Sequence, residues 1–129
     1  MQFSTICLLG IITSIPFGIG FFLSPELTSS AYGITEWSEG TASVGRLLGV
    51  HLLYTGGANF AVWNCTDPSV QRRHSGLFCA VSMLGTFVAL HAAFKPAAPL
   101  LVWSTVATYA FFFFAWGWFA FTPAATVRR

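Results

Sequence analysis

Long apolar stretches follow one another along almost the whole chain, separated by short polar connections. Each is near the ~20 residues that a helix needs to cross about 30 Å of hydrocarbon. The stretches cover residues 3–23, 44–64, 76–94 and 100–122. The pattern predicts an all-α protein, an integral membrane four-helix bundle that occupies residues 1–129 as a single domain.

The second stretch is too polar to be only a membrane anchor. It carries Arg46, His51, Tyr54 and Asn59 within the length of one helix. Polar side chains are costly at that depth and usually face a bundle interior, a cavity or a pathway. His51 and Asn59 are eight residues apart and belong to one slowly drifting helical stripe, with Tyr54 beside it. We therefore expect His51, Tyr54 and Asn59 to face the bundle interior.

Composition supports a membrane protein and narrows its partners. Of the 129 residues, 55% are hydrophobic and 8% are charged, whereas a soluble domain carries about 25% charged residues. The formal net charge of +2 is too small to favour nucleic-acid binding. The expected partners are the lipid bilayer and an apolar small-molecule substrate, with a homo-oligomer left open and no nucleic acid.

Basic residues predict the orientation of the chain in the membrane. Arg72 and Arg73 follow the second stretch, Arg128 and Arg129 end the chain, and the first connection is acidic. Basic connections stay on the cytoplasmic side of a membrane. Both termini are therefore expected on the cytoplasmic side, with the acidic first connection opposite.

The first connection is long for so small a bundle. Ser24 and the following Pro25 and Glu26 are typical of a helix start. A short helix is therefore predicted from Pro25 toward Tyr32, ending at Gly33. Connections of about twenty residues are usually lids, binding elements or disordered segments, so this one is a candidate part of a site.

The proposed topology gathers acid–base groups at the non-cytoplasmic end of the bundle. Carboxylate, imidazole, phenol and guanidinium groups are the parts of an acid–base site. We expect Arg46 to fix a loop carboxylate, and Glu39 is the preferred partner. Glu36 and Glu26 are the alternatives. The expected catalytic residues are Glu39, Arg46 and His51, and the expected substrate-binding residues are Tyr54, Asn59, His91 and Tyr109.

The polar residues of the second stretch also have structural explanations. Arg46 lies near the end of its helix and could extend its charge to the interface. His51 could make a structural hydrogen bond, and Asn59 could join two helices. No Ser-His-Asp order, glycine-rich phosphate loop or zinc-protease motif occurs, so acyl and phosphoryl transfer have no support. Neither the histidines nor the cysteines have a recognised metal-ligand spacing, and no metal or cofactor is expected.

Three short segments resemble a family of very small four-helix membrane proteins. In that pattern a first helix ends at a proline, a glycine-containing loop follows, and the second helix bears an arginine. The segments are Phe21-Phe22-Leu23-Ser24-Pro25, Tyr32-Gly33-Ile34 and Gly45-Arg46-Leu47-Leu48-Gly49. The family includes membrane-bound epoxide hydrolases that tailor fungal polyene polyketides of the aurovertin and citreoviridin type.

The resemblance implies a membrane-embedded tailoring enzyme of secondary metabolism, which we expect in the endoplasmic reticulum. Such an enzyme opens an epoxide of an apolar polyketide-type substrate by acid–base chemistry, either by hydrolysis or by cyclisation to a cyclic ether. The alternatives are a proton-shuttling isomerase or cyclase of a terpenoid or polyketide, and a non-catalytic lipid-binding or transport protein.

Overall fold

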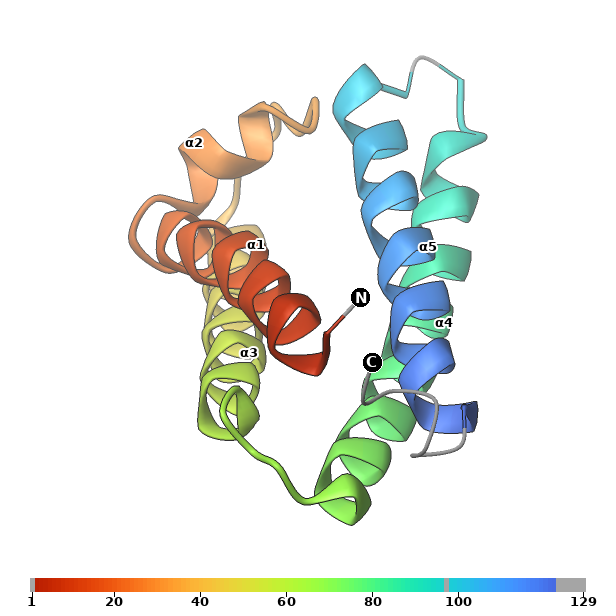
Figure 1. Ribbon diagram of the computed structural model, residues 1–129. Helices are drawn as coiled ribbons and strands as arrows, with labels where there is room; N and C mark the ends of the chain where they lie inside the picture. Colours follow the sequence, from red (N-terminus) through yellow and green to blue (C-terminus); the bar gives the residue numbers. More distant parts are fainter. Residues whose placement is uncertain (1, 97, 123–129) are drawn as a thin grey trace. The chain divides into compact units, whose positions relative to one another are not determined.

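The computed structural model describes residues 2–96 and 98–122, and this part of the chain is all-α (Figure 1). Four long helices and one short helix follow one another, and no strand occurs in the described ranges. The helices are α1 (Phe3–Leu23), α2 (Pro25–Ser30), α3 (Glu39–Val62), α4 (Pro68–Ala93) and α5 (Leu100–Phe121). The prediction of four long helices is confirmed.

Three of these helices, α1, α4 and α5, are long and apolar enough to cross a membrane by length and composition. They indicate an integral membrane protein. Within the described residues α3 does not reach the same apolarity. Arg46, His51 and Asn59 lie in it and lower its mean hydropathy. A fourth membrane span therefore stays a prediction.

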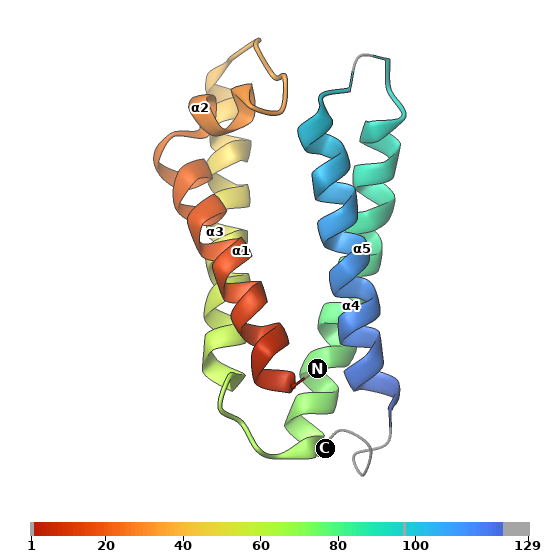
Figure 2. The same cartoon turned by 45° about the horizontal axis from the view of Figure 1, so that its top comes forward.

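The chain divides into two compact units. One comprises Cys7–Trp63 and holds most of α1 with α2 and α3; we call it the α1–α3 unit. The other comprises Met1–Ile6 and Asn64–Arg129 and is called the α4–α5 unit. Figure 2 shows α1 lying along α3 in the first unit and α4 lying along α5 in the second. The union of all the long helices in one bundle stays a prediction.

Helix α3 begins five residues earlier than the predicted apolar stretch. Ser38 is its N-cap, and the Ser38 hydroxyl accepts a hydrogen bond of 3.2 Å from the Thr41 amide. This cap satisfies one of the amides that a helix leaves unpaired at its start. Glu39 therefore lies in the first turn of a helix and not in a loop. In the first turn, the positive end of the helix dipole favours its carboxylate.

Helix α4 also begins earlier than predicted, at Pro68 instead of residue 76. Asp67 is its N-cap and accepts a 2.8 Å hydrogen bond from the Ser69 amide. The Ser69 backbone hydrogen bond is the main cause that lowers the pKa of Asp67. Arg72 and Arg73 consequently lie in a helix, not in a connection. The predicted cluster at Arg128 and Arg129 lies outside the described residues.

The α4–α5 unit is held together by small residues and by one long polar contact. A stripe of small residues on α4 is buried; its members are Ser75, Cys79, Ser82, Ala89 and Ala93. The Arg72 Nε donates a 2.8 Å hydrogen bond to the Ala120 carbonyl of α5. That carbonyl belongs to the last turn of a helix, where cations and donors are favoured.

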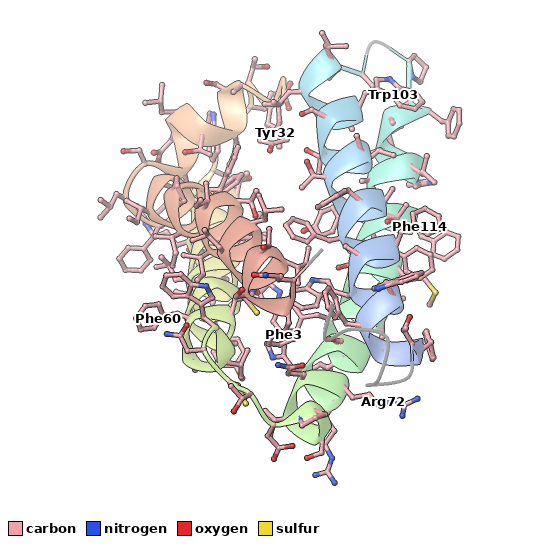
Figure 3. The ribbon with its side chains drawn as sticks, viewed as in Figure 1. Phe3, Tyr32, Phe60, Arg72, Trp103 and Phe114 are labelled. Atoms are coloured by element: carbon pink, nitrogen blue, oxygen red, sulfur yellow. The ribbon has the colours of Figure 1, made fainter. Side chains whose placement is uncertain are left out.

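The first turn of α1 belongs to this unit and packs in an aromatic cluster. The Phe3 ring meets Trp116 edge-on with ring centroids 6.0 Å apart and meets Phe119 with centroids 5.7 Å apart. His74 stacks on Phe78 with centroids 4.3 Å apart and meets Trp116 edge-on. The outward rings of the two units, such as Phe60 and Phe114, are 65% and 72% exposed (Figure 3).

Glycines let α1 and α3 approach each other closely in the α1–α3 unit. A Cβ built on Gly49 would lie 2.6 Å from the Phe22 amide nitrogen and 2.8 Å from the Gly18 carbonyl oxygen, both in α1. Both neighbours are backbone atoms that cannot turn aside. Close backbone approach through small residues is a common way to join membrane helices.

Gly49→Ala is accordingly expected to destabilise the protein by about 1–3 kcal/mol through overpacking. Thermal unfolding of the purified protein in detergent measures this change. Gly57→Ala is the matched control on the same helix, because a Cβ at Gly57 meets no atom within 4 Å. Equal unfolding temperatures for the two variants would contradict the assigned contact.

Candidate functional site

A pocket of about 430 Å³ lies at the N-terminal end of α3, wholly within the α1–α3 unit. Small-molecule sites commonly have volumes of ≈300–1,000 Å³. This pocket therefore has room for a small ligand or for the reacting end of a larger one. It is lined by Glu26 of α2, by Trp37 and Ser38 of the connection, and by Glu39, Ala42, Ser43 and Arg46 of α3.

Helical spacing explains why the α3 residues share one wall of the pocket. Glu39, Ser43 and Arg46 are spaced four and three positions apart, so their side chains leave the same face of the helix. Ala42, on the same side, is buried and too small to fill the space between them. The wall therefore combines a carboxylate, a hydroxyl and a guanidinium group.

The short helix α2 supplies a second carboxylate, that of Glu26. Pro25 opens α2 and is almost fully buried, and a Cβ built on Gly45 would lie 2.7 Å from the Pro25 Cβ. Only a glycine at position 45 lets the proline ring approach α3 so closely. Glu26 directly follows Pro25, so this contact fixes the backbone position from which its side chain lines the pocket.

The end of α2 is fixed as well: the helix ends at Ser30, before the predicted Tyr32, and Gly33 ends the turn that follows it. Gly33 has a φ of 76°, a conformation that glycine adopts without strain. The Ile34 amide donates to the Ser29 carbonyl and the Gly33 amide donates to the Ser30 carbonyl. These two hydrogen bonds are the Schellman pattern, which ends the helix and turns the chain toward α3.

Two of the three carboxylates proposed as partners of Arg46 line the pocket. Glu39 and Glu26 line the pocket with Arg46, whereas Glu36 is not among the lining residues. The three charged side chains are exposed, and no ion pair joins them in the part of the chain that the structure describes. The Arg46–Glu39 pair stays a prediction, and the grouping of these residues in one pocket is observed.

His51 and Tyr54 do not share the pocket. Both are exposed, Tyr54 to 74%, and that they face the interior of a four-helix bundle stays a prediction. The stripe rotates by about 40° for every four residues of an α-helix. It therefore turns by about 80° between His51 and Asn59, and only its C-terminal part reaches the face buried against α1.

Asn59 is buried, as predicted, with only 1% of its surface exposed. Its Nδ2 donates a 3.0 Å hydrogen bond to the Thr55 carbonyl, and a Cβ built on Gly10 of α1 would lie 2.7 Å from that nitrogen. Thirteen residues separate Asn59 from Arg46, about 20 Å along the helix. Its position matches the structural explanation, a polar group between two helices, and lies far from the pocket.

His91 and Tyr109 belong to the α4–α5 unit. His91 is exposed in the last turn of α4, and Tyr109 of α5 packs against Gly85 of α4, where a built Cβ would lie 2.5 Å from the tyrosine ring. Because the pocket belongs to the other unit, their predicted approach to the substrate stays a prediction.

Sequence reasoning missed four of the pocket residues, Trp37, Ser38, Ala42 and Ser43. The signal that could have found them is the serine before Glu39, a typical N-cap residue. Extending the helix to that cap places Glu39, Ser43 and Arg46 on one face. No group of three histidine, cysteine or acidic side chains that could hold a metal ion occurs within the described residues.

Comparisons of this chain with protein-family models, with curated proteins and with solved structures found no match. The acid–base chemistry of the pocket is therefore inferred from its own residues, and the substrate class from the resemblance of the sequence segments.

Proposed function

We propose that the protein is a membrane-embedded tailoring enzyme of secondary metabolism. It opens an epoxide of an apolar polyketide-type substrate by acid–base chemistry, with hydrolysis or cyclisation as the outcome. The observation that supports this function is the pocket that brings Glu39, Glu26 and Arg46 together at small-molecule size. A carboxylate and a guanidinium beside one cavity are the base and the anion stabiliser that epoxide opening requires.

Glu39 is the base in this proposal. Its carboxylate takes a proton from a water molecule, the water oxygen bonds to one epoxide carbon, and the ring C–O bond breaks. Arg46 carries only hydrogen-bond donors, and it stabilises the negative charge on the released oxygen. That oxygen then receives the proton from Glu39, so one water and one epoxide give one diol and the carboxylate is restored.

The same groups serve a cyclisation. If a hydroxyl of the substrate lies where the water would lie, Glu39 takes the hydroxyl proton and the product is a cyclic ether with the mass of the substrate. Which nucleophile is positioned decides the outcome. His51 lies about 140° around α3 from Arg46 and does not line the pocket. In this proposal Arg46 therefore takes the role expected of His51 and stabilises the oxygen that leaves the epoxide carbon.

Turnover in labelled water tests the function. The purified protein in lipid nanodiscs is incubated with an epoxidised polyene in H₂¹⁸O. The products are separated on a chiral column, and their masses are measured by mass spectrometry. A diol with one ¹⁸O indicates hydrolysis, and an isomeric cyclic ether without the label indicates cyclisation. Unchanged substrate at every protein concentration, with epoxides of differing chain length, would refute the proposal.

The membrane arrangement that goes with this function has all four long helices crossing the bilayer, in the endoplasmic reticulum. An even number of spans puts both termini on the same side, here the cytoplasmic side, whereas three spans would separate them. Single cysteines introduced at either end of a variant lacking Cys7, Cys65 and Cys79 are expected to react equally with an impermeant thiol reagent. Labelling of one end from each side of sealed membranes would show that α3 does not cross.

A further inference from the structure

We propose that Glu26 recognises a free hydroxyl group on the substrate, next to the epoxide that reacts. The inference rests on the proposed function, because it assigns a role to Glu26, the pocket carboxylate that epoxide opening does not use. It makes Glu26 a specificity-determining residue and makes the substrate an epoxy alcohol rather than a simple epoxide.

The charges in the pocket are the first argument. The lining residues include two carboxylates and one cation, Arg46. Epoxide opening uses Glu39 and Arg46, and this leaves the carboxylate of Glu26 without a cationic partner among the lining residues. An ionised carboxylate is a pure hydrogen-bond acceptor. When a ligand displaces water from the pocket, the ligand must supply a donor or the carboxylate is left unpaired at a cost.

The fixed position of Glu26 is the second argument. Pro25 holds the start of α2 against Gly45, and the Thr28 hydroxyl donates a 3.0 Å hydrogen bond to the Ser24 carbonyl. Glu26 therefore enters the pocket from a short helix that is anchored at its first residue and closed at Gly33. A carboxylate on an anchored element can discriminate between ligands, since the site does not move to accommodate the wrong one.

The class of donor follows from the rest of the site. Trp37 and Ser43 line the same pocket as Glu26, and their indole and hydroxyl groups suit a neutral oxygenated group. A polyketide-type substrate provides hydroxyl groups, so the donor is an alcohol. An ammonium group would also satisfy the carboxylate, and the experiment separates the two.

The test compares three matched substrates: a polyene epoxide with a neighbouring hydroxyl, its methyl ether, and the corresponding primary amine. The wild-type protein in nanodiscs is expected to favour the alcohol over the ether by about 10–100-fold in kcat/KM. Glu26→Leu is expected to reduce that ratio to near one, and Glu26→Gln, which keeps an acceptor, to retain part of it. Glu36→Leu is the matched control outside the pocket lining and should keep the full ratio.

The ratio separates recognition from general damage, because a variant that merely folds poorly loses activity on all the substrates together. A wild-type protein that turns over alcohol and ether equally, or one that prefers the amine, overturns the inference while the proposed function stands. If no epoxide is turned over, the proposed function fails, and binding then decides the inference. In that case the quenching of Trp37 fluorescence by the saturated diol is compared with quenching by its dimethyl ether, with Trp37→Phe as the blank. Equal or absent quenching by the two ligands overturns it.

Discussion

Arg46→Ala and Glu39→Gln should each slow epoxide opening by about 10²–10⁴-fold, because each removes an acid–base or charge-stabilising group from the reacting atoms. Both side chains are exposed at the pocket and make no ion pair within the described residues. Their replacement is therefore expected to leave the amount of folded protein in the membrane near the wild-type level. Initial rates with an epoxidised polyene, normalised to purified protein, measure the loss.

Two further variants sharpen this experiment. Glu36→Gln makes the same chemical change as Glu39→Gln at an exposed residue outside the pocket lining, and its rate should stay within about twofold of wild type, since surface substitutions rarely matter. His51→Ala distinguishes the pocket from the site expected from sequence. A loss as large as that of Arg46→Ala would return the acid role to His51 and contradict the site described here.

The long helices and their packing faces were predictable because they depend on local composition. Twenty consecutive apolar residues have few alternatives to a helix, and the stripe from Ser75 to Ala93 is recognisable from its spacing alone. Gly49 could be recognised in the same way, because it stands four residues after Gly45 in a pattern that allows close approach. Such features need no knowledge of the partner helix.

The site was only partly predictable, and two physical causes explain the errors. The predicted start of α3 was placed where the chain becomes apolar, because the predicted length was set by the thickness of a membrane. This placement left out the polar first turn that Ser38 caps. The stripe through His51 and Asn59 drifts by about 40° for every four residues, so its residues do not share the face of α3 that lines the pocket. The predicted site therefore contained Glu39 and Arg46 but missed Trp37, Ser38, Ala42 and Ser43.

The contact between Pro25 and Gly45 could not be predicted, because it joins residues twenty positions apart on different helices. It is nevertheless the contact that carries Glu26 into the pocket. Sequence suggested Glu26 as an alternative partner of Arg46, and only the docking of α2 on α3 places the two side chains on one cavity.

Gly45→Ala should therefore reduce kcat/KM for the epoxy alcohol by about 10²-fold, the loss that a displacement near 1 Å can cause at an active site. The new Cβ would lie 2.7 Å from the Pro25 Cβ, whereas carbon atoms in contact prefer about 3.5–4.0 Å. The proline ring is rigid, so α2 has to move by roughly 1 Å to restore that separation. Such a movement shifts Glu26 with it and opens the wall opposite Glu39.

Gly57→Ala again provides the control, since it adds the same methyl group to the same helix where nothing lies within 4 Å. Its kcat/KM should match the wild type. A double-mutant cycle then assigns the loss to Glu26: in a Glu26→Leu background, the fall caused by Gly45→Ala should be smaller, because the group being displaced is already absent. An equal decrease in kcat/KM in both backgrounds would mean that Gly45 acts on the pocket through something other than Glu26 on α2. Full activity of Gly45→Ala would show that the position of α2 does not affect the site.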